Sequence, residues 1–215
     1  LGVTEDRVAT VSLPSPWPPQ PKASVSLDNR DSGPLRLLFF GTVRAYKGLD
    51  LLIQALARTT QPQLTVAGKF WDDEKDYRAL IDRLGLSHRV TIRNGYVARS
   101  EFREVFGEAD LLVLPYRSGT GSIVRELGFA YGLPVIATNT GAISEGIEDG
   151  VTGRVITPDD VSELAIAIKQ AEEPETLTEW SKAVRQRAGN EAEKWAIYTR
   201  ALVGDQTDVN IRRQS

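Results

Sequence analysis

The sequence predicts a doubly wound α/β domain, in which helices cover both faces of a parallel sheet. Two observations predict it. Short apolar runs alternate regularly with stretches whose apolar residues recur at helical spacing, and glycine follows several of the apolar runs. Near-continuous apolar runs are typical of buried parallel strands, and strand–helix alternation is typical of crossover units. A length of 215 residues, 41% of them hydrophobic, fits one well-packed core.

Six short segments are expected to form the strands. Residues 35–40 are apolar except for Arg36 and end at Gly41, while residues 111–114 are the most apolar of the set. Such segments fit strands that are buried on both faces. In chain order, the expected strands are 35–40, 63–67, 89–93, 111–114, 134–137 and 153–156.

Between and after these strands, apolar residues recur at spacings of three and four. Leu49, Leu52, Ile53 and Leu56 show this spacing directly after the first strand. One apolar stripe per helix fits packing against a sheet. The expected helices are 49–56, 77–84, 102–109, 122–131, 161–171, 177–187 and 191–202.

Three regions are expected along the chain. Residues 1–34 are interpreted as a linker from a missing N-terminal domain, because five prolines between positions 14 and 21 favour extended structure. Residues 35–203 are the α/β domain, and 204–215 are expected to be a flexible polar tail. Because the sequence begins at Leu1 and contains no methionine, we expect further sequence upstream.

Composition excludes several classes of function. The chain has no cysteine and a single histidine, His88, so thiolate metal sites and a Ser–His–Asp triad are not expected. Clustered acidic residues occur only at helix starts, where the helix dipole explains them, so we expect no metal. A net charge of −3 gives no attraction to nucleic acid. With no transmembrane run and no signal peptide, a cytoplasmic location is expected.

The first candidate loop, residues 41–48, follows the first expected strand and opens the next helix. Gly41 and Thr42 lie at the strand end, where glycine lets the backbone approach a ligand closely. Arg44 and Lys47 add positive charge beside the free N–H groups of the helix start, a setting typical of phosphate sites. The same residues also fit a plain strand-to-helix turn with two solvated cations.

The second candidate loop, residues 115–122, leaves the most apolar strand and is rich in glycine and hydroxyl groups. We expect it to hold a phosphate or a sugar diphosphate, and the carboxylate of Glu126 to accept hydrogen bonds from ribose hydroxyls. Alternatively, Thr120 or Ser122 caps the helix, and Glu126 pairs with a nearby basic residue. The residues expected to contact the ligand here are Tyr116, Ser118, Gly119, Thr120, Gly121, Ser122 and Glu126.

Three further loops complete the predicted site. Gly68 follows the second strand, and Tyr96 and Val97 follow the third, where an aromatic ring and exposed backbone fit a nucleobase. Residues 138–145 follow the fifth strand and would close the cleft from the other side. Taken singly, these segments also fit ordinary turns with a packed tyrosine.

Together, three segments resemble the C-terminal domain of family 4 glycosyltransferases, the retaining GT-B group. They are FFGTVRAYKGLDLLIQAL, VAGKF and ADLLVLPYRSGTGSIVRELGFAYGLPVIATNTGAISEGIEDGVTGRVI. Their order and spacing cover about residues 35–170. The resemblance implies that Lys47 contacts the diphosphate of a nucleotide-sugar donor and that Gly41 is the strand-end glycine. It also implies metal-independent catalysis by Lys47 and Arg44, without a cofactor.

The sequence departs from this family at two places. The family usually has an arginine directly after the strand-end glycine, where this chain has Thr42; Arg44 lies two residues on. The family's two glutamates, eight residues apart, are replaced by Gly119 and Leu127, and Glu126 is one residue out of register. The chain therefore resembles a branch in which a Ser/Thr/Gly-rich stretch replaces the pair.

The resemblance predicts transfer of a hexose from a nucleoside diphosphate to a glycan, lipid or small-molecule acceptor. The acceptor, and any peripheral membrane contact, would come from the missing N-terminal domain. Three alternatives remain at this point: a non-catalytic nucleotide-sugar-binding module, an epimerase or phosphorylase of similar architecture, and a flavodoxin-like signalling domain.

Overall fold

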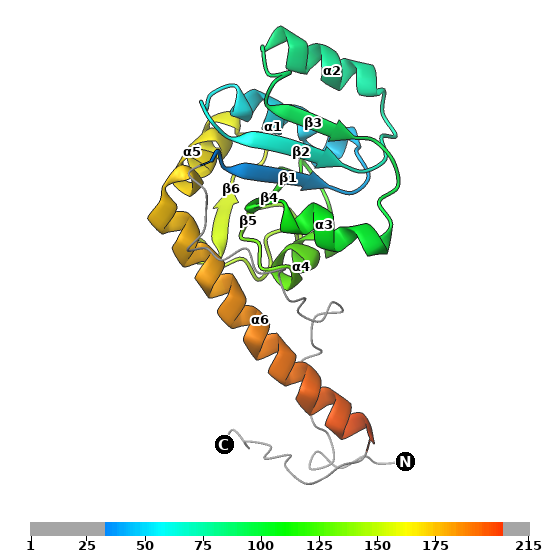
Figure 1. The fold of residues 1–215 in the computed structure, drawn as a ribbon, viewed down its shortest axis with the longest axis vertical. Coiled ribbons are helices and arrows are strands. Elements are labelled where there is room, and N and C mark those ends of the chain that lie inside the picture. The colour runs from blue at the N-terminus through cyan, green and yellow to red at the C-terminus, as the bar shows by residue number, and fades with distance from the viewer. Residues whose placement is uncertain (1–32, 204–215) are drawn as a thin grey trace.

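The computed structural model describes residues 33–203, and the expected linker and tail lie almost wholly outside them. Six parallel strands form one sheet in the order β3-β2-β1-β4-β5-β6 (Figure 1). This order is that of a doubly wound sheet, which confirms the predicted fold class. The strands are β1 (Arg36–Phe40), β2 (Gln63–Ala67), β3 (Val90–Arg93), β4 (Leu111–Leu114), β5 (Val135–Thr138) and β6 (Gly153–Ile156).

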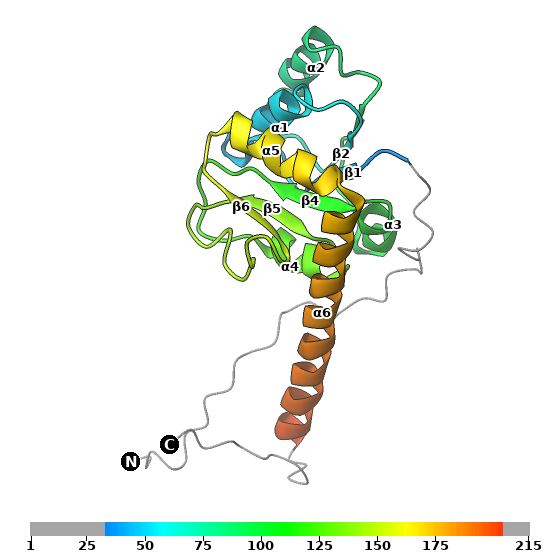
Figure 2. The same ribbon diagram turned by 90° about the vertical axis from the view of Figure 1, so that its left-hand side faces the viewer.

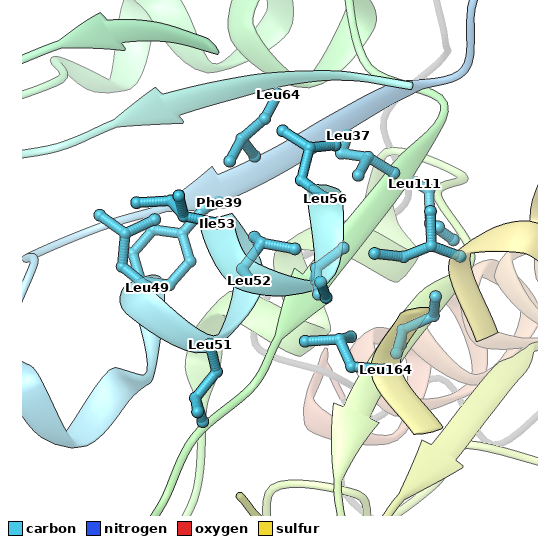
Figure 3. Packing of buried hydrophobic residues seen from close by; sticks show 14 of the residues in the cluster. Leu37, Phe39, Leu49, Leu51, Leu52, Ile53, Leu56, Leu64, Leu111 and Leu164 are labelled. Atoms are coloured by element: carbon cyan, nitrogen blue, oxygen red, sulfur yellow. The ribbon is translucent and has the colours of Figure 1, made fainter. Parts of the chain in front are cut away.

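Helices cover both faces of the sheet because side chains alternate along each strand. Leu37 and Phe39 of β1 pack with α1, α2 and α5 on one face, while Leu38 and Phe40 pack with α3 and α4 on the other (Figures 2 and 3). The α-helices are α1 (Leu49–Leu56), α2 (Glu74–Arg83), α3 (Phe102–Gly107), α4 (Ile123–Ala130), α5 (Val161–Glu172) and α6 (Pro174–Val203). Two short 3₁₀ turns are η3 (Ala45–Lys47) and η4 (Arg99–Glu101).

Figure 3 shows the larger of the two cores from close by. Leucine and isoleucine side chains of α1 lie between the strands and Leu164 of α5. Leu49, Leu52, Ile53 and Leu56 are all fully buried, as their helical spacing predicts. This packing fixes α1 against β1, and with it the start of α1 next to the first candidate loop.

The prediction of two separate C-terminal helices is wrong, because α6 is a single helix of 30 residues. Gly189 lies inside it; a glycine within a helix costs only about 1 kcal/mol relative to alanine, which does not end a long helix. Leu177 and Trp180 pack on one core and Val184 on the other. The C-terminal half extends beyond the sheet domain (Figures 1 and 2).

The strand order brings two candidate loops together. β1 pairs with β4, with Leu38 opposite Leu112, although two strands and three α-helices separate them in sequence. The strand order reverses between them, and ligands of doubly wound sheets bind at the carboxyl ends of the strands at this switch point. Across residues 33–203, no helix is long and apolar enough to cross a membrane.

Candidate functional site

The β1–α1 loop turns sharply through η3 and then through Gly48. Gly48 adopts a left-handed conformation with φ of +69°, and a Cβ atom there would lie 2.0 Å from the carbonyl oxygen of Pro115. Only glycine allows this approach. The first loop therefore passes directly against the second, as the topology predicts.

Lys47, the last residue of η3, points inward and is only 9% exposed. Its Nζ lies 5.4 Å from the centre of the Tyr116 ring and 3.6 Å from the position that a Cβ atom on Gly41 would take. Within residues 33–203, no carboxylate or carbonyl accepts a hydrogen bond from this Nζ. Burial lowers the pKa of Lys47, and the positive charge of Arg44 lowers it further. A largely buried lysine side chain with no carboxylate partner among the described residues favours an anionic ligand.

The start of α4 lies next to the same place. Val124 Cγ2 is 3.7 Å from the Cβ position of Gly41, beside Lys47 Nζ. Ser122 occupies the N-cap of α4, but its side chain does not accept a hydrogen bond from the helix N–H groups. The amides of the first turn thus keep their capacity for an anion. Burial raises the pKa of Tyr116 to about 12, so its hydroxyl stays neutral.

Arg117 joins the first two loops, and sequence reasoning missed it. Its guanidinium donates to both oxygens of Asp50, to Asp159 and to the carbonyl of Ala45. Its backbone N–H donates to the carbonyl of Tyr46 at 2.7 Å. An arginine between a tyrosine and a serine in an exposed loop gives no local signal of these partners.

Glu126 pairs with a nearby basic residue, which is the second of the two interpretations of the sequence. Its Oε1 accepts from Nε and Nη2 of Arg125, at 3.0 and 2.7 Å. Arg125 also donates to the carbonyls of Ala142 and Ile143, which ties α4 to the third loop. Glu126 thus pairs with a basic neighbour through Oε1, and the contact of its carboxylate with a ribose stays a prediction.

The third loop interlocks with the second. Gly141 has a φ of +49°, and a Cβ atom on it would lie 1.8 Å from the carbonyl oxygen of Gly119. The hydroxyl of Thr138 donates to the carbonyl of Tyr116 at 2.6 Å. Three loops thus meet at the carboxyl edge, as the sequence predicts. Ser118, Thr120 and Gly121 are exposed there, and Thr42 is half-buried.

Arg44 and Gly68 have other contacts. Arg44 is exposed and stacks on the indole of Trp71, 4.3 Å from the ring centre. A Cβ atom on Gly68 would lie 1.9 Å from the carbonyl oxygen of Gly41, so Gly68 supports the first loop from below.

Two cavities flank the loops. One, of about 190 Å³, lies beside Tyr96 and Val97 at the carboxyl end of β3; Tyr96 is 87% exposed above it. The other, of about 600 Å³, lies between η3, α2 and the second loop, where Tyr46, Arg117 and Ser118 contribute to its wall. Lys47 lines neither cavity. In the part of the chain that the structure describes, no acidic or histidine cluster is placed to hold a metal ion.

Comparison with known proteins agrees with this geometry. The family described as "Glycosyl transferases group 1" matches residues 34–173. D-inositol 3-phosphate glycosyltransferase of Mycobacterium sp. (strain KMS) is 30% identical over 151 residues, which are 68% of this chain and 34% of the relative. Glycogen synthase of Mycobacterium tuberculosis is 32% identical over 164 residues, 73% of this chain and 38% of that protein.

Solved structures show the same fold. The crystal structure of Anabaena HepE in complex with UDP and glucose superposes with a TM-score of 0.68 at 24% identity, covering 80% of this chain and 48% of that one. The chain thus spans about a third of the curated relatives and about half of this structure. The chain belongs to the group 1 glycosyltransferase family, and its described domain has the fold found in GT-B glycosyltransferases.

Proposed function

We propose that this domain binds the nucleoside diphosphate of a sugar donor at the carboxyl edge between β1 and β4, in a retaining glycosyltransferase. One observation carries the proposal. The side chain of Lys47 is only 9% exposed and has no carboxylate partner among residues 33–203, and its ammonium lies beside Gly41 and the uncapped start of α4. A diphosphate supplies the negative charge that this arrangement lacks.

Such a site would stabilise the leaving group. When the bond from the sugar to the β-phosphate breaks, negative charge grows on the phosphate oxygens. Lys47 and the amides at the start of α4 are already in place to meet it, which is the preorganised form of electrostatic stabilisation. We propose that this charge makes a metal unnecessary, and that Arg44 adds to it from the rim.

The nucleoside would lie toward β3. The cavity of about 190 Å³ beside Tyr96 and Val97 offers backbone and an exposed aromatic ring for a base. UDP and glucose are bound by the related Anabaena structure, which makes a uracil nucleotide and a hexose the first choice here. The second loop, with Ser118, Gly119, Thr120, Gly121 and Ser122, would face the sugar.

The acceptor would be bound by a further domain, because the curated relatives extend well beyond the matched region. The names of these relatives include an inositol phosphate and glycogen. We therefore propose that the domain shared with them binds the sugar donor, and that the acceptor differs from one relative to another. We propose a glycan, lipid or small hydroxylated acceptor, with membrane contact, if any, outside this domain.

A titration of the chain with UDP, GDP, dTDP and ADP tests the proposal. Binding of one nucleoside diphosphate is expected, and Lys47→Met should weaken it about 10- to 100-fold, since hydrogen bonds to charged groups contribute about 1.5–3 kcal/mol. Lys75→Met, which removes an exposed lysine on α2, is the matched control. Absence of binding to all four ligands, or equal affinity of Lys47→Met and the wild type, contradicts the proposal.

A second candidate is a nucleotide-sugar-binding module without catalysis. Glu126 pairs with Arg125 through Oε1, and the apolar Leu127 stands where the family has its second glutamate, so the usual glutamate pair is absent. Glycosyl transfer by the full-length protein would decide against this candidate, whereas binding without transfer would favour it.

A further inference from the structure

Every nitrogen of the Arg117 guanidinium donates a hydrogen bond to a segment distant in sequence. Nη1 and Nη2 each lie 2.7 Å from an oxygen of Asp50, Nε lies 2.8 Å from Asp159, and Nη1 also reaches the carbonyl of Ala45 at 2.8 Å. The hydrogen bonds to Asp50 raise the pKa of Arg117, so its charge is permanent. A fork of this kind fixes the relative position of its partners.

These contacts converge on the turn that carries Lys47. η3 consists of three residues, Ala45 to Lys47, and the carbonyls of the first two accept from Arg117. Lys47 itself has no side-chain anchor in the described chain beyond the face of Tyr116. The position of its Nζ is therefore set by the backbone of η3, and the β4–α4 loop holds that backbone.

The backbone of Asp159 gives a second observation on the contacts of Arg117. Asp159 is the one non-glycine residue with positive φ, +61°, among residues 33–203. This conformation is unfavourable for a residue with a side chain, and it persists where surrounding contacts hold it. Here it directs the carboxylate to Nε of Arg117.

We infer that Arg117 is a positioning residue, which holds η3 so that the ammonium of Lys47 lies where the diphosphate binds. The inference rests on the proposed function. A purely structural brace would stabilise the loops without affecting the anion. A positioning residue acts through Lys47, and this difference can be measured.

The experiment is calorimetric titration of the chain with inorganic pyrophosphate, which needs no knowledge of the base. Arg117→Gln is expected to weaken binding about tenfold, in the range of couplings carried by contact networks. In a Lys47→Met background, Arg117→Gln should have no further effect, because the residue through which it acts is gone. Arg117→Lys, which keeps the charge and loses the fork, should fall between wild type and Arg117→Gln.

Arg36→Gln is the matched control. Arg36 makes the same bidentate contact with Asp110 at the opposite edge of the sheet, so its loss should lower stability and leave pyrophosphate affinity unchanged. If Arg117→Gln does not fold, Asp159→Gly can replace it in the same titration. It removes one carboxylate and relieves the positive φ, and it should weaken pyrophosphate about threefold without lowering the melting temperature.

The outcomes separate the two claims. If wild type binds neither pyrophosphate nor a nucleoside diphosphate, the proposed function and the inference both fail. If wild type binds and Lys47→Met does not, but Arg117→Gln and Asp159→Gly keep full affinity, only the role of Arg117 is overturned. Additive losses in the Arg117→Gln, Lys47→Met double variant also overturn it.

Discussion

The two edges of the sheet contain the same interaction with different consequences. At the amino edge, Arg36 at the start of β1 binds both oxygens of Asp110 before β4, at 3.0 and 2.8 Å. At the carboxyl edge, Arg117 after β4 binds both oxygens of Asp50 in α1. Each pair ties the β1 side of the sheet to the β4 side, across the point where strand order reverses.

The two edges differ in whether a charged side chain is left without an ion-pair partner. At the amino edge, Asp110 also accepts from the backbone N–H of Arg36, and the backbone N–H of Asp110 bonds to the carbonyl of Arg36. At the carboxyl edge, the brace leaves Lys47 buried without a counter-charge. Ion pairing at one edge therefore serves folding alone, whereas at the other it surrounds a cation that is available to a ligand.

The largest expected effect comes from the crowded backbone at the carboxyl edge. Gly48 and Gly85 have nearly the same φ, +69° and +70°, but a Cβ atom on Gly48 meets Pro115 at 2.0 Å, whereas one on Gly85 meets nothing within 4 Å. Gly48→Ala should lower the free energy of unfolding by about 3 kcal/mol, and Gly85→Ala by about 1 kcal/mol. Urea denaturation measures both.

Since the conformational strain is the same at both glycines, the difference between the two variants isolates the collision of the loops. Equal losses would mean that the first two loops can separate without cost. The close contact between the first two loops would then contribute nothing to stability, and the carboxyl edge would not differ from the amino edge in this respect.

The two aspartates are expected to differ next. The side chain of Asp110 is 9% exposed and that of Asp50 is 33% exposed, so loss of the buried charge partner should matter more. Asp110→Asn should lower the free energy of unfolding by about 1–2 kcal/mol, and Asp50→Asn by less than about 1 kcal/mol. The order should reverse for pyrophosphate affinity, which only Asp50→Asn should weaken. A larger stability loss for Asp50→Asn would contradict the comparison.

Lys47 should destabilise the ligand-free protein. Burial lowers its pKa, which means that folding disfavours its charged form. Lys47→Met keeps the aliphatic stem and removes the charge, so it should raise the free energy of unfolding by about 0.5–2 kcal/mol, as substitutions that remove functional strain often do. A melting temperature below that of the wild type would instead assign Lys47 a stabilising role.

The smallest effect is the pH dependence. The unfolded lysine titrates near 10.5 and the folded one lower, so between these values the unfolded chain binds more protons, and stability rises with pH. The penalty is complete below the lowered folded pKa of Lys47 and is lost as the pH approaches 10.5. The stability difference between Lys47→Met and wild type should therefore shrink as the pH rises above the lowered pKa of Lys47 toward 10.5. Pyrophosphate affinity should fall over the same range, as Lys47 loses its proton. A constant difference would contradict the lowered pKa.

Local sequence signals were sufficient for most of the fold, whereas the position of the site stays a prediction. Apolar runs and helical spacing depend on neighbours in the chain, and they gave all six strands correctly. The glycine at the end of β1 and the lysine before α1 are also local signals, and they led to the prediction of a phosphate site in the first loop. Lys47 does lie beside Gly41 and faces the second loop.

Partners distant in sequence were not predictable. Arg117 and Asp159 lie 42 residues apart, and no spacing rule links them. Pairing of Glu126 with a nearby basic residue was one of two open interpretations, but the sequence did not show that Arg125 is that residue or that it also donates to the third loop. The sequence also did not predict that α6 continues through Gly189. Glycine is common at helix ends, and only the packing of the helix shows that it does not end there.

The most direct test is a crystal structure of the chain with the nucleoside diphosphate that it binds most tightly. A phosphate oxygen should lie about 2.7–3.2 Å from Lys47 Nζ, with another accepting from an amide at the start of α4. A diphosphate bound elsewhere, with Lys47 Nζ still facing only Tyr116, would contradict the view that this buried cation is the anion site.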